Sequence, residues 1–163
     1  MRRLFAVAGL AFWFAAAPAH ALLCQPILGC SCSVSTGGLA FGSINPLSPG
    51  PTDATATIHV ACDGVIDVAP SVTAKIGAGQ SGSFADRQMK NGAQVLHYNL
   101  YSSNLYSTIL GDGTGGYPTI AVSGGLVTLG AWSEDATLYG RTPAAPATPP
   151  GNYNDTVTVR IDW

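Results

Sequence analysis

The sequence has few charged residues and no long stretch in which apolar residues recur at the helical period. Asp, Glu, Lys and Arg make up 10% of its 163 residues, against ~25% in an average globular domain. The formal net charge is −2, and a chain with no basic excess lacks the charge pattern of a phosphate-binding surface. We therefore expect no nucleic-acid partner, and the missing helical periodicity argues against an all-α bundle.

Residues that form turns are, by contrast, abundant. The chain contains 20 Gly and 11 Pro. Its apolar share of 47% is too high for a disordered chain, and its length suits one domain. We therefore expect a small, Gly-rich, weakly charged β protein.

The first residues follow the three-part plan of a secretory signal peptide. A short basic start, Met1-Arg2-Arg3, precedes an apolar stretch over residues 4–18 and a small-residue site that ends at Ala21. The apolar stretch is short for a membrane span of ~30 Å. We interpret residues 1–21 as a signal peptide cleaved after Ala21, so the mature chain is exported and not embedded in a membrane.

Four cysteines follow the predicted cleavage site, which favours two disulfides in an oxidising compartment. They are Cys24, Cys30, Cys32 and Cys62. A Cys30–Cys32 bond would close a strained ring, so two pairings remain: Cys32–Cys62 with Cys24–Cys30, or Cys30–Cys62 with Cys24–Cys32. We favour the first, because Cys32 opens one strand pattern and Cys62 closes the next. The spacing does not suit a zinc site.

Four segments alternate apolar and polar residues with the period of two that is typical of half-buried strands. They are residues 55–62, 68–76, 94–101 and 156–163. Weaker strand patterns cover residues 32–41, 120–122, 126–132 and 137–140. Short strands separated by turn residues at near-regular spacing predict an all-β sandwich.

The last of these segments has the clearest alternation. Its predicted inward face consists of Val157, Val159, Ile161 and Trp163. No residue after Trp163 could return as a further strand. We therefore expect the final strand to lie beside a gap.

The order of these features resembles the spore coat protein U domain family, which includes subunits of archaic chaperone–usher pili. The resemblance covers residues 32–163 and rests on several short motifs. These are Cys32-Ser-Val-Ser, Leu39-Ala-Phe-Gly-Ser-Ile-Asn-Pro46, Thr57-Ile-His-Val-Ala-Cys62, Arg87-Gln-Met-Lys-Asn-Gly92, Leu96-His-Tyr-Asn-Leu-Tyr101, Tyr139-Gly-Arg141 and the segment from Pro150 to Trp163.

The resemblance implies an immunoglobulin-like β-sandwich that lacks one strand. It implies a structural subunit of a bacterial surface fibre that serves adhesion or biofilm formation. In such subunits a periplasmic chaperone fills the groove left by the missing strand, and the amino-terminal extension of the next subunit then replaces it. The implied partners are therefore this chaperone, an outer-membrane usher and other pilus subunits, and the implied groove residues are the inward set of the final strand.

The segment that would serve as the donor is short. Residues 22–31 offer four apolar side chains, Leu22, Leu23, Ile27 and Leu28, but also contain a proline and two cysteines. A Cys24–Cys30 bond would bend this segment, whereas a donor strand must be extended. An alternative is therefore a tip adhesin, or a free secreted binding module that never enters a fibre.

No arrangement of residues predicts catalysis. His59 and His97 fall on outward strand faces with no nucleophile beside them in sequence. The Gly-rich stretch 111–116 lacks the Gly-Lys-Ser/Thr of a phosphate loop and has too few acidic residues for a calcium loop. We therefore expect neither enzymatic activity nor a cofactor.

Overall fold

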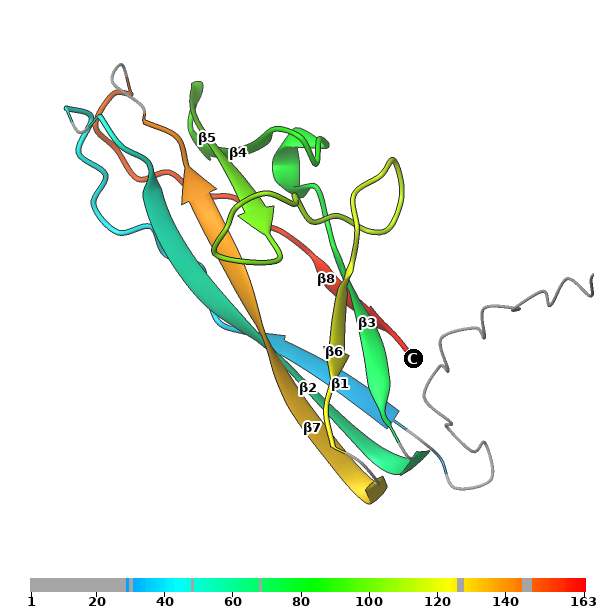
Figure 1. Cartoon of the computed structure of the whole chain (residues 1–163). Helices are drawn as coiled ribbons and strands as arrows, with labels where there is room; N and C mark the ends of the chain where they lie inside the picture. Colours follow the sequence, from blue (N-terminus) through cyan, green and yellow to red (C-terminus); the bar gives the residue numbers. More distant parts are fainter. Residues whose placement is uncertain (1–28, 30, 48, 68, 126–127, 145–147) are drawn as a thin grey trace, which may run out of the picture.

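The computed structural model describes residues 29, 31–47, 49–67, 69–125, 128–144 and 148–163. It contains two antiparallel sheets, one of five strands in the order β1-β2-β7-β5-β4 and one of three in the order β6-β3-β8 (Figure 1). The strands are β1 (Ser31–Thr36), β2 (Thr52–Asp67), β3 (Ser71–Ile76), β4 (Arg87–Asn91), β5 (Gln94–Tyr101), β6 (Ile120–Ser123), β7 (Thr128–Thr142) and β8 (Val159–Asp162). One short 3-10 turn, η1 (Gly79–Ser81), follows β3. The prediction of an all-β sandwich is confirmed.

The longest strands, β2 and β7, pair over nearly their whole length and form the middle of the five-stranded sheet (Figure 1). Their register runs from Thr52 opposite Thr142 to Asp67 opposite Thr128, with one shift between Cys62 and Val65. Gly64 lies in this bulge with φ +74°, a conformation that glycine adopts without steric cost. The pairing of β2 with β7 resumes at Val65, opposite Gly130, and on its other side Cys62 lies opposite Cys32 of β1.

The core lies between the sheets and consists of the inward residues of the central strands. The alternation predicted for β2, β3 and β5 is confirmed, since the predicted inward residues with described side chains are all buried: Ala56, Ile58, Val60, Cys62, Val72, Ala74, Ile76, Leu96, Tyr98 and Leu100. Val68, which was also predicted to be inward, lies outside the described residues. Full burial of one such aliphatic side chain stabilises the fold by about 1.5–3 kcal/mol.

Several strand boundaries differ from the sequence prediction. The strand expected over residues 68–76 begins only at Ser71, directly after Pro70, whose nitrogen cannot donate to a ladder. Residues 128–132 and 137–140 of two predicted segments belong to the single strand β7, and residues 126–127 lie outside the described residues. The strand expected over 32–41 ends at Thr36, before two glycines. Pro70 and the two glycines after Thr36 end regular strand pairing and were given too little weight. Between residues 132 and 137 no glycine or proline interrupts the chain, so two predicted segments form one strand.

Two further differences concern β4 and β8. The sequence predicts no strand over Arg87–Asn91, which the structure shows as β4, with the charged Arg87 buried. The final strand was predicted over 156–163 but spans only Val159–Asp162. Its alternation holds for Val159 and Ile161, which are half-buried, whereas Trp163 is 46% exposed. Trp163, which was predicted to face inward, is therefore not part of the buried core.

Candidate functional site

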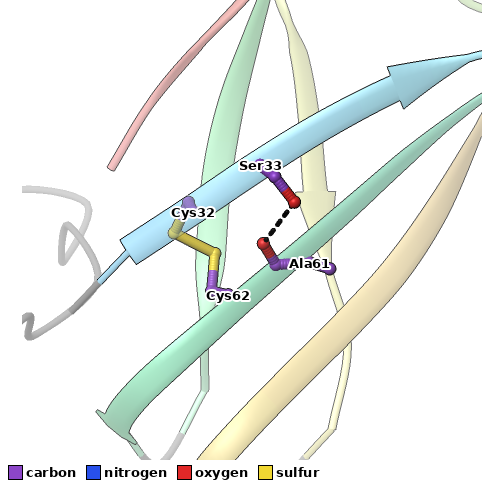
Figure 2. Close-up of a disulfide and its surroundings, with 4 residues drawn as sticks. All are labelled: Cys32, Ser33, Ala61 and Cys62. Atoms are coloured by element: carbon purple, nitrogen blue, oxygen red, sulfur yellow. Dashed lines mark hydrogen bonds between the residues drawn. A yellow bond between two sulfur atoms is a disulfide. The ribbon is translucent and has the colours of Figure 1, made fainter.

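A disulfide ties the edge strand β1 to the five-stranded sheet. Cys32 lies opposite Cys62 in the β1–β2 register, and their sulfur atoms are bonded at 2.06 Å (Figure 2). The neighbouring Ser33 donates a hydrogen bond to the Ala61 carbonyl at 3.4 Å (Figure 2). The favoured pairing of Cys32 with Cys62 is confirmed. Cys24 and Cys30 lie outside the described residues, so their pairing stays a prediction.

The strands β1 and β8 each have one edge with no backbone partner among the described residues. β1 pairs with β2 alone, and β8 pairs with β3 alone. The additional backbone bonds next to them, from Gly37 N to Thr57 O and from Gly77 N to Thr158 O, lie on the sides that are already paired. The free edges of the two strands therefore offer donors and acceptors to a further strand.

The inward side chains next to these free edges are only partly covered. Cys32 and Val34 of β1 are half-buried, as are Val157, Val159 and Ile161 in or just before β8. The corresponding residues of the central strands are buried almost completely. The sandwich is therefore less well covered along the side where β1 and β8 face each other.

A cleft of about 370 Å³ opens on this side. Its floor is formed by inward residues of four strands of the five-stranded sheet: Ala56, Ile58, Met89, Tyr98, Leu100 and Leu138. One wall is the end of β1 and the chain that follows it, residues 36–39 and 41, and the other is the chain that enters β8, residues 153–157 and 159. The cleft is thus an apolar trough between two segments that lie more than 100 residues apart in the sequence.

The chain after β1 shapes one end of the trough. Leu39 rests on Gly140 of β7, where a Cβ atom would lie 2.7 Å from the leucine methyl carbons. Phe41 packs edge-on against Tyr98 with ring centroids 5.9 Å apart. A second hollow of about 600 Å³ shares Leu39, Phe41, Met89 and Tyr153 with the first. The apolar surface therefore continues beyond the end of β1.

The opposite wall is fixed by Asp155. One carboxylate oxygen accepts hydrogen bonds from the backbone nitrogens of Gln80 (2.8 Å) and Thr156 (2.7 Å), and the other accepts from the Tyr98 hydroxyl at 2.8 Å. Gly79 lies beneath it, and any Cβ there would collide with the carboxylate. Burial, with the hydrogen bond to Asp155 as the next cause, raises the pKa of Tyr98 far above its usual value. Tyr98 is therefore a permanent donor to this carboxylate at physiological pH.

Arg87 is a buried cation behind this wall. Its side chain is 0% exposed and donates to the carbonyls of Gly77 (2.8 and 3.0 Å) and Leu110 (2.9 Å) and to Asn99 Oδ1 (3.3 Å). Burial lowers the pKa of Arg87, and the charge of Asp155 partly opposes that effect. The guanidinium thus joins β4 to the end of β3 and to the loop before β6.

The structure divides the predicted groove residues into two sets. Val157 and Val159 line the cleft. Ile161 is half-buried further along β8 and Trp163 is exposed, and neither lines the cleft. The predicted donor residues Leu22, Leu23, Ile27 and Leu28 lie outside the described residues.

The sequence reading missed most of the lining. Leu39 and Phe41 fall in the weaker strand pattern over residues 32–41, for which no inward face was assigned. Tyr153 and Asp155 precede the predicted final strand, so the period-two test did not reach them. The available signal was their place in two of the short motifs quoted above, 39–46 and 150–163.

Both outward histidines have a carboxylate partner that sequence spacing did not indicate. The Nδ1 atoms of His59 and His97 lie 2.5 Å from carboxylate oxygens of Asp135 and Asp86, respectively. The hydrogen bond from His97 is the main cause that lowers the pKa of Asp86. Both pairs are well exposed and neither lines the cleft. Within the described ranges no group of three or more His, Cys, Asp or Glu residues is placed to hold a metal ion.

A cluster of residues around Arg141 holds the loop after β5 against the outer face of the five-stranded sheet. The Arg141 guanidinium lies 3.5 Å from the ring centroid of Tyr106 and makes two hydrogen bonds to Asp53, at 2.7 and 2.8 Å. The rings of Tyr101 and Tyr139 meet Tyr106 edge-on. Tyr106 has φ +52°, an uncommon conformation for a residue other than glycine. The polar groups of the cluster bond to one another, and together these contacts hold the loop against the sheet.

The part of the chain that the structure describes contains no helix long and apolar enough to cross a membrane.

Among curated proteins, none shows significant similarity to this chain. Among solved structures, a chain of the CsuC-CsuE chaperone–tip adhesion subunit pre-assembly complex from the archaic chaperone-usher Csu pili of Acinetobacter baumannii is similar, with a TM-score of 0.50 and 16% sequence identity. The alignment covers 82% of this chain and 40% of that chain, so this chain spans less than half the length of its structural relative. The likeness shows the immunoglobulin-like sandwich fold. The Spore Coat Protein U domain matches residues 19–160, which is most of the sequence, and the chain therefore belongs to the Spore Coat Protein U domain family.

Proposed function

We propose that this protein is a secreted structural subunit of a bacterial surface fibre of the chaperone–usher type. In this proposal its sandwich is incomplete, and the cleft between β1 and β8 accepts a β-strand from a partner. The observation that carries the proposal is that β1 and β8 each have an edge without a partner among the described residues, with half-buried apolar side chains beside it. Membership of the Spore Coat Protein U domain family and the fold shared with a chain of a pilus complex support it.

The physical basis is strand addition. Backbone groups of an added strand would pair with the free edges, and every second side chain would enter the trough between Leu39 on one wall and Val157 on the other. A cleft without an occupant would expose apolar side chains beside an open sheet edge, which favours aggregation. The proposed first occupant is a strand of a periplasmic chaperone, and the second is the amino-terminal segment of the next subunit.

The proposal includes the export route and the place of action. Residues 1–21 serve as a signal peptide, residues 22–31 as the donor extension, and residues 32–163 as the sandwich. An outer-membrane usher then assembles the subunits into a fibre that serves adhesion or biofilm formation. The protein has no catalytic role and needs no cofactor.

The experiment that tests this function uses the exported chain with and without a strand donor. Produced alone, it should aggregate or be degraded. Coproduced with a chaperone of its family, or refolded with a synthetic peptide in which Val and Thr alternate, it should form a soluble one-to-one complex. A chain that purifies alone as a stable monomer and binds neither partner would refute the proposal.

A second candidate is a tip adhesin or a free secreted binding module. The proline and the two cysteines within residues 22–31 favour it, because they oppose an extended donor strand. A chaperone-bound protein that never donates to another subunit would identify the tip. Independence from any strand donor would identify the free module.

A further inference from the structure

Asp155 lies where the chain passes from one sheet to the other. Just before it, Asn154 pairs with Lys90 at the outer edge of β4 through backbone bonds of 2.8 and 3.1 Å. Just after it, the Thr158 carbonyl accepts a bond from Gly77 at the end of β3. The segment between them has no ladder of its own, yet it forms one wall of the cleft. Its position therefore depends on side-chain contacts.

The carboxylate of Asp155 makes those contacts to both sheets at once. Through Tyr98 it is bonded to β5 of the five-stranded sheet, and through Gln80 to η1, which follows β3 of the three-stranded sheet. Gly79 allows the carboxylate to approach closely, because only a residue without Cβ fits beneath it. Buried Arg87 lies nearby and its pKa responds to the charge of Asp155. The hydrogen bonds of Asp155 and its close packing on Gly79 hold the wall in place without any contribution from an occupant of the cleft.

We infer that Asp155 is a positioning residue that fixes the width of the cleft before a strand enters it. This inference rests on the proposed strand-acceptor function and assigns to one carboxylate the task of keeping the empty cleft in its receptive shape. In the filled cleft the added strand itself supports the wall. Loss of Asp155 therefore reduces the fraction of molecules that are competent to bind, and the apparent affinity falls by that fraction.

The kinetic consequence separates this role from simple stabilisation. If the empty wall becomes mobile, association slows because fewer molecules present the open cleft, whereas dissociation from the filled cleft stays nearly unchanged. Asp155→Asn keeps the size of the side chain but replaces one acceptor oxygen with an amide donor. Tyr98→Phe removes only the hydroxyl that bonds to that carboxylate. Asp112→Asn is the matched control, because Asp112 bonds only within its own exposed loop and does not line the cleft.

The test refolds the exported chain in the presence of a fluorescein-labelled peptide in which Val and Thr alternate, because the empty chain is expected to aggregate, and measures how much peptide the chain binds. Titration gives the affinity, and a chase with unlabelled peptide gives the dissociation rate. We expect Asp155→Asn to weaken affinity by about tenfold, as for loss of one charge-assisted hydrogen bond, with the dissociation rate within about twofold. Tyr98→Phe should act in the same direction, and Asp112→Asn should match the parent.

Two results would overturn the inference. Either Asp155→Asn and Tyr98→Phe bind the peptide as the parent does, or their loss of affinity lies wholly in faster dissociation. A parent chain that binds no peptide at all would instead refute the proposed strand-acceptor function, and the inference with it. The behaviour of the parent therefore distinguishes the two failures.

Discussion

Removal of the Cys32–Cys62 disulfide should destabilise the protein substantially. The bond joins residues 30 positions apart, and closing a loop of that length lowers the entropy of the unfolded chain by an amount equivalent to about 3.7 kcal/mol at 25 °C. The folded state also depends on the bond, because β1 pairs with β2 on one side only. We therefore expect the double variant Cys32→Ala/Cys62→Ala to lose about 3–4 kcal/mol of unfolding free energy.

The measurement is guanidinium chloride denaturation of the peptide-bound protein, because occupation of the cleft gives parent and variant the same starting state. For a domain of this size the loss corresponds to a fall in Tm of roughly 10–15 °C. The double variant is preferable to a reductant, which would also act on any bond between Cys24 and Cys30. Ser33→Ala is the control, since it removes only the exposed 3.4 Å hydrogen bond to Ala61, and it should change the free energy by less than about 0.5 kcal/mol.

Two results would contradict this prediction about the disulfide. If the double variant unfolds within about 1 kcal/mol of the parent, below the usual range for a native disulfide, the bond does not restrict the unfolded chain as argued. A variant that unfolds early but still binds the peptide with unchanged affinity would show that β1 keeps its place without the bond. The expected dependence of β1 on the disulfide would then be disproved.

Three other substitutions test separate parts of the structure. Val159→Asp places a carboxylate in the cleft and should abolish peptide binding in the titration, whereas Thr158→Asp on the outward face should leave it intact. Arg87→Met leaves the carbonyls that Arg87 contacts without donors and should lower the unfolding free energy by about 2–4 kcal/mol in the same denaturation assay. The hydrogen bond from Arg141 chiefly lowers the pKa of Asp53, so the stabilisation is present above the unfolded value near 4 and is lost as pH falls through the lower folded value. Amide NMR shifts of the 102–108 loop should titrate below about pH 4 in the parent and remain constant there in Asp53→Asn.

The fold could be predicted from the sequence wherever one face of a strand is buried and the other is solvated. In β2, alternation alone assigns Ala56, Ile58 and Val60 to the core, because a shift of one residue would expose the whole set. The same logic failed at Arg87, where a charged residue occupies an inward position and finds its partners in carbonyls of distant loops. No local sequence pattern indicates such partners, so the sequence did not predict β4.

The cleft was harder to predict than the sheets. One wall follows from the alternation that places Val157 and Val159 inward, but the other depends on Leu39 and Phe41, which pack through tertiary contacts with Gly140 and Tyr98. These contacts join segments that are distant in the sequence, and residue spacing carries no information about them. The burial of Trp163 was predicted wrongly for a related reason. The alternation test assumes that a second layer covers the inward face of a strand, but Trp163 is 46% exposed.

The two walls of the cleft are held by different means, and the difference matters for assembly. β1, whose last residue begins one wall, is attached to β2 through the covalent bond between Cys32 and Cys62. The wall before β8 is attached through hydrogen bonds of Asp155, which can open and reform on the timescale of loop motion. Under the proposed exchange of strands, the disulfide would keep β1 in place throughout, and the hydrogen bonds of Asp155 would hold its segment in the receptive shape whenever the cleft is empty.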